Sequence, residues 1–529
     1  RHGNRAMSGR LWSKEFQGSF FRSLSGNARR IAISARIFQQ APNRENGMQN
    51  FSPQSTSLAQ VSEYEISDNA RLTLWLAAAV AAICGGLYGY DTGIISGALL
   101  LITRDFHLGS TDQELVASAI LAGAVIGAVG TGWLSERFGR RTTVMIVTAL
   151  FVTGALACSM APDVGTLIAA RVYLGLGVGG STQVVPMYIS ELAPAAQRGR
   201  LVTLFNVAIG IGIFLANIVG FAMRDAWGWR PMIAIAAGPA LFVFVAMFFL
   251  PRSPRWTAEN RGLKAAIREL IKVRTSHREI HKEIGKIHAA AENVSDEQRG
   301  WRGLSQPWVR PALVAAFGVA FFTQCGGLEM MIYYAPTFLS DAGFGHSAAL
   351  LASVGVAVVY LVMTFTGSMV VDRIGRRRLM LIMGPGSVLS LIGLGLMFMM
   401  HPDKGSVGSW MIIVFLLLFM MFNSGGIQVV GWLLGAEMFP LPMRGTATSL
   451  HAATLWGSNL LVTSTALTLV QTISLGGTMW FYAGVNLASV LFVYFLVPET
   501  RGASLEDIEK ALKEGRFRPR RGQTAIVEQ

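Results

Sequence analysis

The sequence predicts an all-α membrane protein with twelve transmembrane helices. Of its 529 residues, 52% are hydrophobic and only 14% are charged, and the mean hydropathy is +0.45. Soluble domains carry about 25% charged residues, so this composition argues against an ordinary soluble enzyme. A helix needs about 20 mostly apolar residues to cross the hydrocarbon core of a bilayer. Twelve such runs occur, at residues 72–101, 115–135, 142–161, 164–189, 201–223, 231–250, 312–339, 348–371, 379–400, 410–436, 446–471 and 477–497.

The basic residues sort to one side of these spans. The formal net charge is +14, yet only four of the 45 Lys and Arg residues fall in loops on the other side: Arg104, Arg224, Arg230 and Lys404. Because basic residues favour cytoplasmic loops, we predict a multi-pass protein of the plasma membrane, or of the inner membrane in a bacterium, with both termini in the cytoplasm. Topology thus explains the charge, and we expect no nucleic-acid partner. All three cysteines fall within spans, so no disulfide framework or zinc site is predicted.

The spans form two groups of six, separated by a polar stretch. Within that stretch Leu263, Ile267 and Leu270 recur at helical spacing, which predicts short amphipathic helices on the cytoplasmic face. The first 47 residues are rich in Arg and Ser and nearly free of acidic residues, so we expect them to be disordered or to lie upstream of the true start. The predicted segments are an N-terminal extension at 1–71, a six-helix bundle at 72–250, a linker at 251–311, a second six-helix bundle at 312–497 and a tail at 498–529.

Three charged motifs occur once in each half of the chain. The matching residues lie 236 to 247 residues apart in every pair, so chance is a poor explanation and we infer an internal repeat. The pairs are WLSERFGRR at 133–141 with VVDRIGRRR at 370–378, ELAPAAQRG at 191–199 with EMFPLPMRG at 437–445, and PRSPR at 251–255 with PETRG at 498–502.

Together with YYAP at Tyr333–Pro336, these motifs resemble the sugar porter family of the major facilitator superfamily. The resemblance extends from residue 72 to residue 502. It implies two six-helix halves around a central substrate site, which rock to expose that site to each side of the membrane in turn. It also implies a secondary transporter rather than an enzyme. The expected partners are a sugar, polyol or cyclitol, a proton and the lipid bilayer, with no cofactor or metal, and the expected functional unit is a monomer.

The repeated motifs predict a charged latch at the cytoplasmic ends of the spans. Exposed ion pairs contribute only about 0–1 kcal/mol each, so a network that breaks on opening acts as a bistable latch rather than a stabilising device. Ordinary topology signals would explain the arginines but not the acids at matched positions. Arg252 departs from the family pattern, which has Glu there, so the latch on that side is expected to be rearranged. The predicted latch residues are Glu136, Arg137, Arg140, Arg141, Glu191, Arg198, Asp372, Arg373, Arg376, Arg377, Glu437, Arg444, Glu499 and Arg501.

Two opposite charges lie inside predicted spans, Asp91 in the first and Arg171 in the fourth. A carboxylate ionised in lipid costs several kcal/mol unless it faces a cavity and has a partner. The resemblance pairs these two positions, and family members that use no proton often have an amide in place of the aspartate. We therefore interpret Asp91 as the proton site, because a motion that changes its distance from Arg171 would switch its proton affinity. The alternative is a static salt bridge between the two spans.

The family's substrate positions keep their aromatic residues here and about half of their amides. Amides donate and accept hydrogen bonds to hydroxyl groups, and an aromatic face suits the C–H side of a sugar ring. Glu329 replaces the family's asparagine. It could accept hydrogen bonds from the substrate, attract a cationic group or titrate as a second site, or it could be a protonated carboxyl that only packs. The predicted substrate-binding residues are Asn206, Thr323, Gln324, Glu329, Tyr333, Tyr360 and Trp432.

GLGVGG, at 175–180, fits the dinucleotide fingerprint GxGxxG, but it follows no strand and lies inside a predicted span. We interpret its glycines as positions where helices pack closely. A facilitative uniporter or a transporter-like nutrient sensor stays an alternative to proton symport.

Overall fold

The apolar runs of the sequence form long helices. The computed structural model describes residues 64–194, 197–223, 227–292, 300–403, 406–503 and 505–519, and every regular element within these ranges is helical. All of these residues belong to one unit, which begins at Leu58. The N-terminal extension up to residue 63 lies outside the described residues, so the structure does not test what was predicted for it.

The first six predicted spans form seven helices, since the sixth span is built from two short ones. They are α3 (Ala70–Phe106), α4 (Ser110–Phe138), α5 (Arg140–Ser159), α6 (Val164–Leu192), α7 (Arg198–Met223), α8 (Trp229–Ala234) and α9 (Ala237–Ala246). The last six predicted spans form η3 (Pro307–Val309), α14 (Arg310–Cys325), α15 (Leu328–Asp341), α16 (His346–Ile374), α17 (Arg376–Met399), α18 (Val407–Phe422), the π-helix η4 (Asn423–Ile427), α19 (Gln428–Glu437), α20 (Leu441–Thr463) and α21 (Ala466–Leu496).

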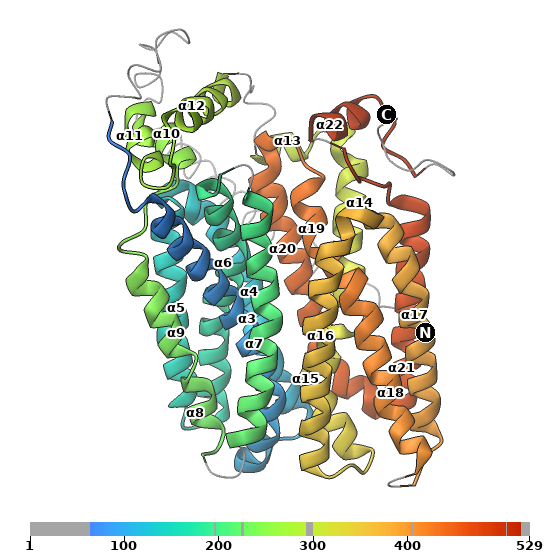
Figure 1. Ribbon diagram of the computed structural model, residues 1–529. Helices are drawn as coiled ribbons and strands as arrows, with labels where there is room; N and C mark the ends of the chain where they lie inside the picture. Colours follow the sequence, from blue (N-terminus) through green and yellow to red (C-terminus); the bar gives the residue numbers. More distant parts are fainter. Residues whose placement is uncertain are drawn as a thin grey trace, which may run out of the picture. The chain divides into compact units, whose positions relative to one another are not determined.

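Short helices gather at one end of the long ones (Figure 1). They are the linker helices α10 (Pro254–Arg261), α11 (Leu263–Leu270), α12 (His277–Glu292) and α13 (Gly300–Leu304), together with α22 (Leu505–Lys513) near the C-terminus. We call this end of the molecule the linker end and the other the opposite end. The predicted amphipathic pattern is confirmed, because Ile267 and Leu270 of α11 pack with Ile280 and Ile284 of α12 in a small core of their own.

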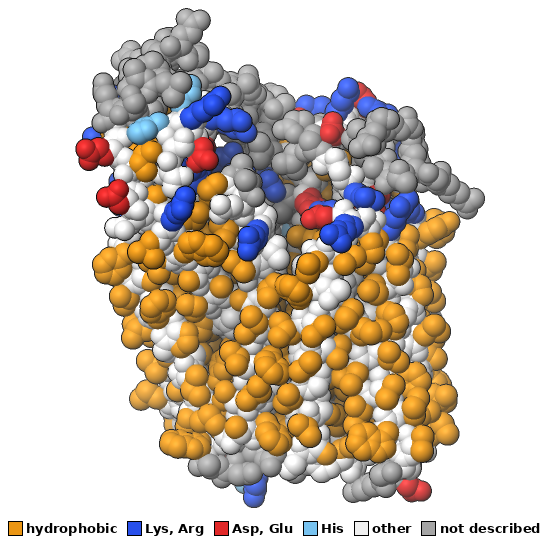
Figure 2. All heavy atoms as spheres, in the orientation of Figure 1, with side chains coloured by type: hydrophobic (Ala, Val, Ile, Leu, Met, Phe, Trp, Pro, Cys, Tyr) orange, Lys and Arg blue, Asp and Glu red, His pale blue; other side chains and the backbone are white. Residues whose placement is uncertain are grey.

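Within the part of the chain that the structure describes, eleven runs of helix are long and apolar enough to cross a membrane. Figure 2 shows the band of apolar side chains that results, with the charged side chains gathered at the linker end and few at the opposite end. The helix α20 has 23 residues but is more polar, since it carries Arg444, His451 and Asn459. It packs against α4 and α14 among the long helices, so we count it as the twelfth.

The structure corrects the seventh, eleventh and twelfth predicted spans. The seventh span is not continuous, because its helix breaks between α14 and α15 at Gly326 and Gly327. The eleventh span was expected to run to residue 471, but α20 ends at Thr463. The chain then starts α21 at Ala466 and kinks it at Ser474, which has a left-handed φ of 68°. Hydropathy does not reveal these breaks, because apolar residues continue on both sides of each one.

Glycines set how closely the helices approach. A Cβ atom at Gly89 of α3 would lie 1.9 Å from the Ile209 carbonyl oxygen of α7, and one at Gly175 of α6 would lie 2.1 Å from that of Ile120 in α4. These backbones therefore touch in a way that only glycine permits. The packing interpretation of GLGVGG is confirmed. The two groups of spans meet where α4 lies along α20, α7 along α16 and α3 along α15.

Candidate functional site

The two predicted intramembrane charges are both buried. Asp91 on α3 is 5% exposed, and the Arg171 side chain on α6 is fully buried. The two groups interact electrostatically, but the described residues show no ion pair between them. All three guanidinium nitrogens of Arg171 lack a hydrogen-bond partner in the described part of the chain. The static salt bridge considered as the alternative is thus absent from this arrangement.

The break between α14 and α15 positions four of the predicted substrate residues. Thr323 and Gln324 lie in the last turn of α14, and Glu329 and Tyr333 lie in the first two turns of α15. Between them Gly327 has a φ of 88°, a conformation that glycine adopts without strain. A Cβ atom at Gly327 would also lie 3.1 Å from the ring of Tyr482 on α21.

Asn486 of α21 holds this break from the side. Its amide donates to the Gly326 carbonyl at 2.8 Å and to the Tyr482 carbonyl at 2.8 Å, and its oxygen accepts from Ser387 at 3.0 Å. The carbonyl that the helix break frees is therefore satisfied inside the protein, as the membrane interior requires. Asn486 was not predicted, because one asparagine in an apolar helix gives no sign of its partner.

Glu329 lies in a polar cluster between α15, α16 and α19. The side chain is 2% exposed, and one carboxylate oxygen accepts a hydrogen bond from Gln428 at 3.5 Å. The Tyr360 hydroxyl lies beside Gln428 and Thr364 and interacts with Glu329. Gln428 was not predicted, although a polar residue in an apolar run four residues before Trp432 was an available signal.

Three aromatic rings, one from the first group of spans and two from the second, lie against one another. The ring centroids of Tyr88 (α3) and Trp456 (α20) are 5.2 Å apart, and Trp432 (α19) lies 6.3 Å from Tyr88 and 6.1 Å from Trp456. The Trp456 indole donates to Thr182 of α6 at 3.3 Å. Trp432 was predicted as a site residue, whereas Tyr88 and Trp456 were not. We call Tyr88, Trp432 and Trp456 the aromatic triangle.

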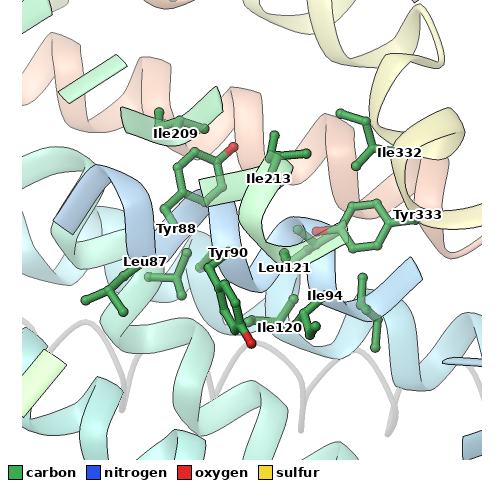
Figure 3. Close-up of a cluster of buried hydrophobic side chains, with 14 of the residues drawn as sticks. Leu87, Tyr88, Tyr90, Ile94, Ile120, Leu121, Ile209, Ile213, Ile332 and Tyr333 are labelled. Atoms are coloured by element: carbon green, nitrogen blue, oxygen red, sulfur yellow. The ribbon is translucent and has the colours of Figure 1, made fainter. Parts of the chain in front are cut away.

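Buried apolar side chains pack around Tyr88 and Tyr333 (Figure 3). Isoleucines and leucines of α3, α4, α7 and α15 are packed there, including Ile94, Ile209 and Ile332. A few polar groups in such an apolar setting are typical of small-molecule sites.

Several buried polar atoms in this region have no partner within the described ranges. Unsatisfied buried groups cost about 1–3 kcal/mol each, so their accumulation here indicates a place for a polar ligand. Most are acceptor oxygens, which suit a ligand that presents hydrogen-bond donors. They are Gln324 Oε1, Glu329 Oε2, Asn423 Oδ1 and Gln428 Oε1, with the hydroxyls of Thr323 and Thr364.

Asn206 is the predicted substrate residue with the least support from geometry. It is half-buried on α7 and forms no hydrogen bond to the described residues. One turn later, Gly210 packs against Leu361, the neighbour of Tyr360 on α16. Asn206 therefore lies on the side of α7 that faces α16, but the structure does not bring it into contact with the other predicted residues.

The predicted latch forms ion pairs within each half rather than between the halves. Arg140 pairs with Glu191 at 3.1 Å, and Arg376 pairs with Glu437 and with Asp372, both at 2.7 Å. In the described part of the chain, no ion pair joins latch residues of the two halves. The expected lock between the halves is therefore not made by direct ion pairs in this structure.

The other latch residues bind backbone groups or face solvent. Glu499 accepts from the backbone N–H groups of Arg376, Arg378 and Arg501 at 2.9, 3.1 and 3.2 Å. The Arg141 side chain donates to the carbonyls of Met247 and Phe248, and that of Arg377 to the carbonyl of Tyr494. Glu136, Arg137, Arg198 and Arg373 are exposed. Arg444 is half-buried in a cavity of about 370 Å³ that Asp372, Arg376 and Glu437 also line.

Arg252 lies at the position that matches Glu499 of the second half. Its backbone N–H donates to Glu269 at 3.2 Å, and no carboxylate at this position caps α5 as Glu499 caps α17. Burial, together with the nearby Arg261 and Arg141, lowers the pKa of Arg252. The two halves therefore differ in charge at this matched position.

The comparisons with known proteins agree on one family. The family described as "Sugar (and other) transporter" matches residues 77–512. The galactose-proton symporter of Escherichia coli (strain K12) is 35% identical over 441 residues, covering 83% of this chain and 94% of the relative. The major myo-inositol transporter IolT of Bacillus subtilis (strain 168) is 34% identical, covering 82% of this chain and 92% of the relative. The partially occluded inward-open structure of the xylose transporter XylE from E. coli superposes with a TM-score of 0.71 at 26% identity, covering 82% of this chain and 99% of that one.

Proposed function

Because this chain belongs to the sugar transporter family of the major facilitator superfamily, we propose that it is a proton-coupled symporter for a sugar, polyol or cyclitol. Two six-helix halves, 72–250 and 312–497, rock about the central residues and expose them to each side of the plasma membrane in turn. The basic linker end faces the cytoplasm, where both termini lie in the predicted topology, and the opposite end faces outward. The transporter acts as a monomer.

The observation that carries the proton proposal is the unpaired burial of Asp91 and Arg171. Burying two opposite charges without contact between them costs free energy, because neither charge keeps its water. Each group is therefore stabilised by a step that neutralises its charge. Proton binding neutralises Asp91 while the groups are apart, and contact with Arg171 would expel that proton. Motion of α3 against α6 therefore links proton binding to conformation.

The charge balance near the central site supports the same proposal. Asp91, Glu329 and Arg171 are all buried, and with all three ionised they leave a net charge of minus one. A single bound proton restores neutrality, which a membrane interior favours. Tyr88 of the aromatic triangle lies three residues before Asp91, on the same face of α3, so a substrate against that ring would sit close to the proton site.

The test is proton uptake by the protein in reconstituted vesicles. A panel of sugars, polyols, cyclitols and amino sugars is added one compound at a time, and external pH is recorded beside entry of the labelled solute. Symport predicts alkalinisation outside with one class of compound. Entry of the solute without proton movement would make the protein a uniporter, and a lack of entry for every compound would favour the sensor.

Trp432→Ala is expected to weaken binding of the transported solute about tenfold, because aromatic contacts contribute about 0.5–1.5 kcal/mol beyond the area they bury. Substrate affinity is measured by counterflow or by calorimetry in detergent. The matched control is Trp410→Ala, a tryptophan of α18 that is 65% exposed. An unchanged affinity in Trp432→Ala would move the substrate site elsewhere.

Glu329→Asn and Glu329→Gln are expected to change which compounds of the panel compete best, since each replaces a carboxylate next to Gln428 by a neutral amide. The Gln variant keeps the length of the side chain, so a difference between the two separates charge from shape. The measurement is competition against the best substrate. An identical order of competitors in wild type and both variants would assign Glu329 to packing.

A further inference from the structure

We propose that Glu114 is a gating residue at the opposite end, where its carboxylate caps a helix of the other half and so holds this end closed. The proposal rests on the proposed function, because a gate has meaning only for a protein that opens alternately. Its test nevertheless needs neither substrate nor proton gradient. Glu114 belongs to none of the repeated charged motifs.

Glu114 is a buried acid with strong partners across the molecule. It lies in the second turn of α4 and is only 3% exposed. Its two carboxylate oxygens accept from the backbone N–H of Thr468 at 2.7 Å and from the Thr468 hydroxyl at 2.6 Å. Nearby, the Gln471 amide donates to the Ser110 hydroxyl at 2.6 Å. Two residues of α4 thus bind two residues that follow them by more than 350 positions.

These bonds supply a cap that the receiving helix does not make itself. Thr468 lies in the first turn of α21, whose N-cap residue Thr465 makes no side-chain cap hydrogen bond. The first turn of a helix has unpaired N–H groups and a positive dipole end, and a carboxylate is the group that satisfies both. Glu114 therefore completes the start of α21 from the other half of the protein.

The capped turn is a separate piece of helix. Ser474, with its φ of 68°, interrupts α21 eight residues after its start at Ala466. On the other side, the Tyr334 hydroxyl donates to the Thr463 carbonyl at the end of α20 at 2.9 Å. The junction of α20 and α21 is thus held by α4 through Glu114 and by α15 through Tyr334.

This arrangement connects the gate to the central site. Tyr334 interacts electrostatically with Glu114 and adjoins Tyr333, one of the predicted substrate residues. Separation of α4 from α21 at this end must break both bonds to Thr468. Because hydrogen bonds to a charged group are roughly twice as strong as neutral ones, their loss sets a threshold for opening.

The test measures the separation of the two halves at the opposite end. Spin labels are placed on cysteines introduced at Met160 and Met400, which are 78% and 65% exposed and are the C-cap residues of α5 and α17 at this end. The three native cysteines are buried. Distance distributions are recorded in lipid nanodiscs for the wild-type background, Glu114→Ala, Thr468→Val and the double variant, with Asp112→Asn as the control. Asp112 is an exposed acid in the first turn of α4, two residues before Glu114.

We expect Glu114→Ala to raise the ratio of long to short distances by about tenfold, the effect of losing a charged hydrogen-bond acceptor. Thr468→Val should shift the ratio less, since it keeps the backbone donor, and Asp112→Asn should leave it unchanged. In the double variant the effects should not add, because both changes remove the same interaction. Unchanged distributions in folded Glu114→Ala and Thr468→Val, or fully additive effects, would overturn the proposal. If Glu114→Ala shifts the distance distribution but the wild-type protein takes up no proton in the vesicle assay, the gating proposal stands and proton symport is rejected.

Discussion

Asp91→Asn is expected to abolish uphill accumulation of the solute. The amide has nearly the same shape as the carboxylate but does not take up a proton, so the variant lacks the link between the proton gradient and the motion of α3 against α6. The ratio of solute inside to outside should fall to about one at steady state, whatever the pH gradient. Exchange between labelled and unlabelled solute should persist, because it needs substrate binding and rocking but no net proton transfer.

The two assays together decide the role of Asp91. The control is Asp68→Asn, which changes an exposed acid just before α3 and should leave accumulation intact. Accumulation that survives in Asp91→Asn would show that another group carries the proton, and Glu329 would be the next candidate. Loss of both accumulation and exchange in a folded variant would instead assign Asp91 to substrate binding.

Gly175→Val is expected to destabilise the protein severely. A Cβ atom at this position lies 2.1 Å from the Ile120 carbonyl oxygen and 2.9 Å from the Cα of Gly123, so α6 and α4 must separate to admit it. Overpacking of this kind costs about 1–3 kcal/mol or more, and the atoms in the way are backbone, which yields less than a side chain. Arg171 lies one turn before Gly175, so the same shift would displace it. The measurement is thermal unfolding in detergent, with transport assayed in parallel.

Gly130→Val on α4 is the matched control for this change. Nothing lies within 4 Å of a Cβ atom added there, so it brings the same β-branched residue into a helix without the clash. We expect nearly wild-type unfolding and transport for Gly130→Val. Equal stability of the two variants would mean that the α4–α6 contact is looser than the structure shows.

The charges inside the membrane could be predicted because a charge in an apolar run is conspicuous by itself. Asp91, Arg171 and Glu329 each interrupt a hydrophobic stretch, and all three are buried in the structure. The gating acid Glu114 escaped notice, because it stands at the start of a span where acids are common. Its role depends on Thr468, and no local pattern identifies a partner so far along the chain.

The aromatic triangle was only partly predictable for a related reason. Trp432 could be assigned through the family motif, but aromatic residues are frequent in helices that pack or face lipid. Tyr88 and Trp456 join Trp432 only because α3 and α20 meet α19 at one place. The same holds for the latch, where the sequence identifies the charges and the fold selects partners within each half.

The sequence by itself determined the class of the protein. Hydropathy predicted the number of spans, because a helix needs a long apolar run to cross a bilayer. The distribution of basic residues predicted the topology, and the repeated motifs predicted the division into two groups of six. Only the tertiary structure decided where helices break, as at Gly327 and Ser474, and which side chains meet. Breaks and contacts depend on partners that satisfy freed backbone groups, such as Asn486 and Glu114, and those partners come from distant parts of the chain.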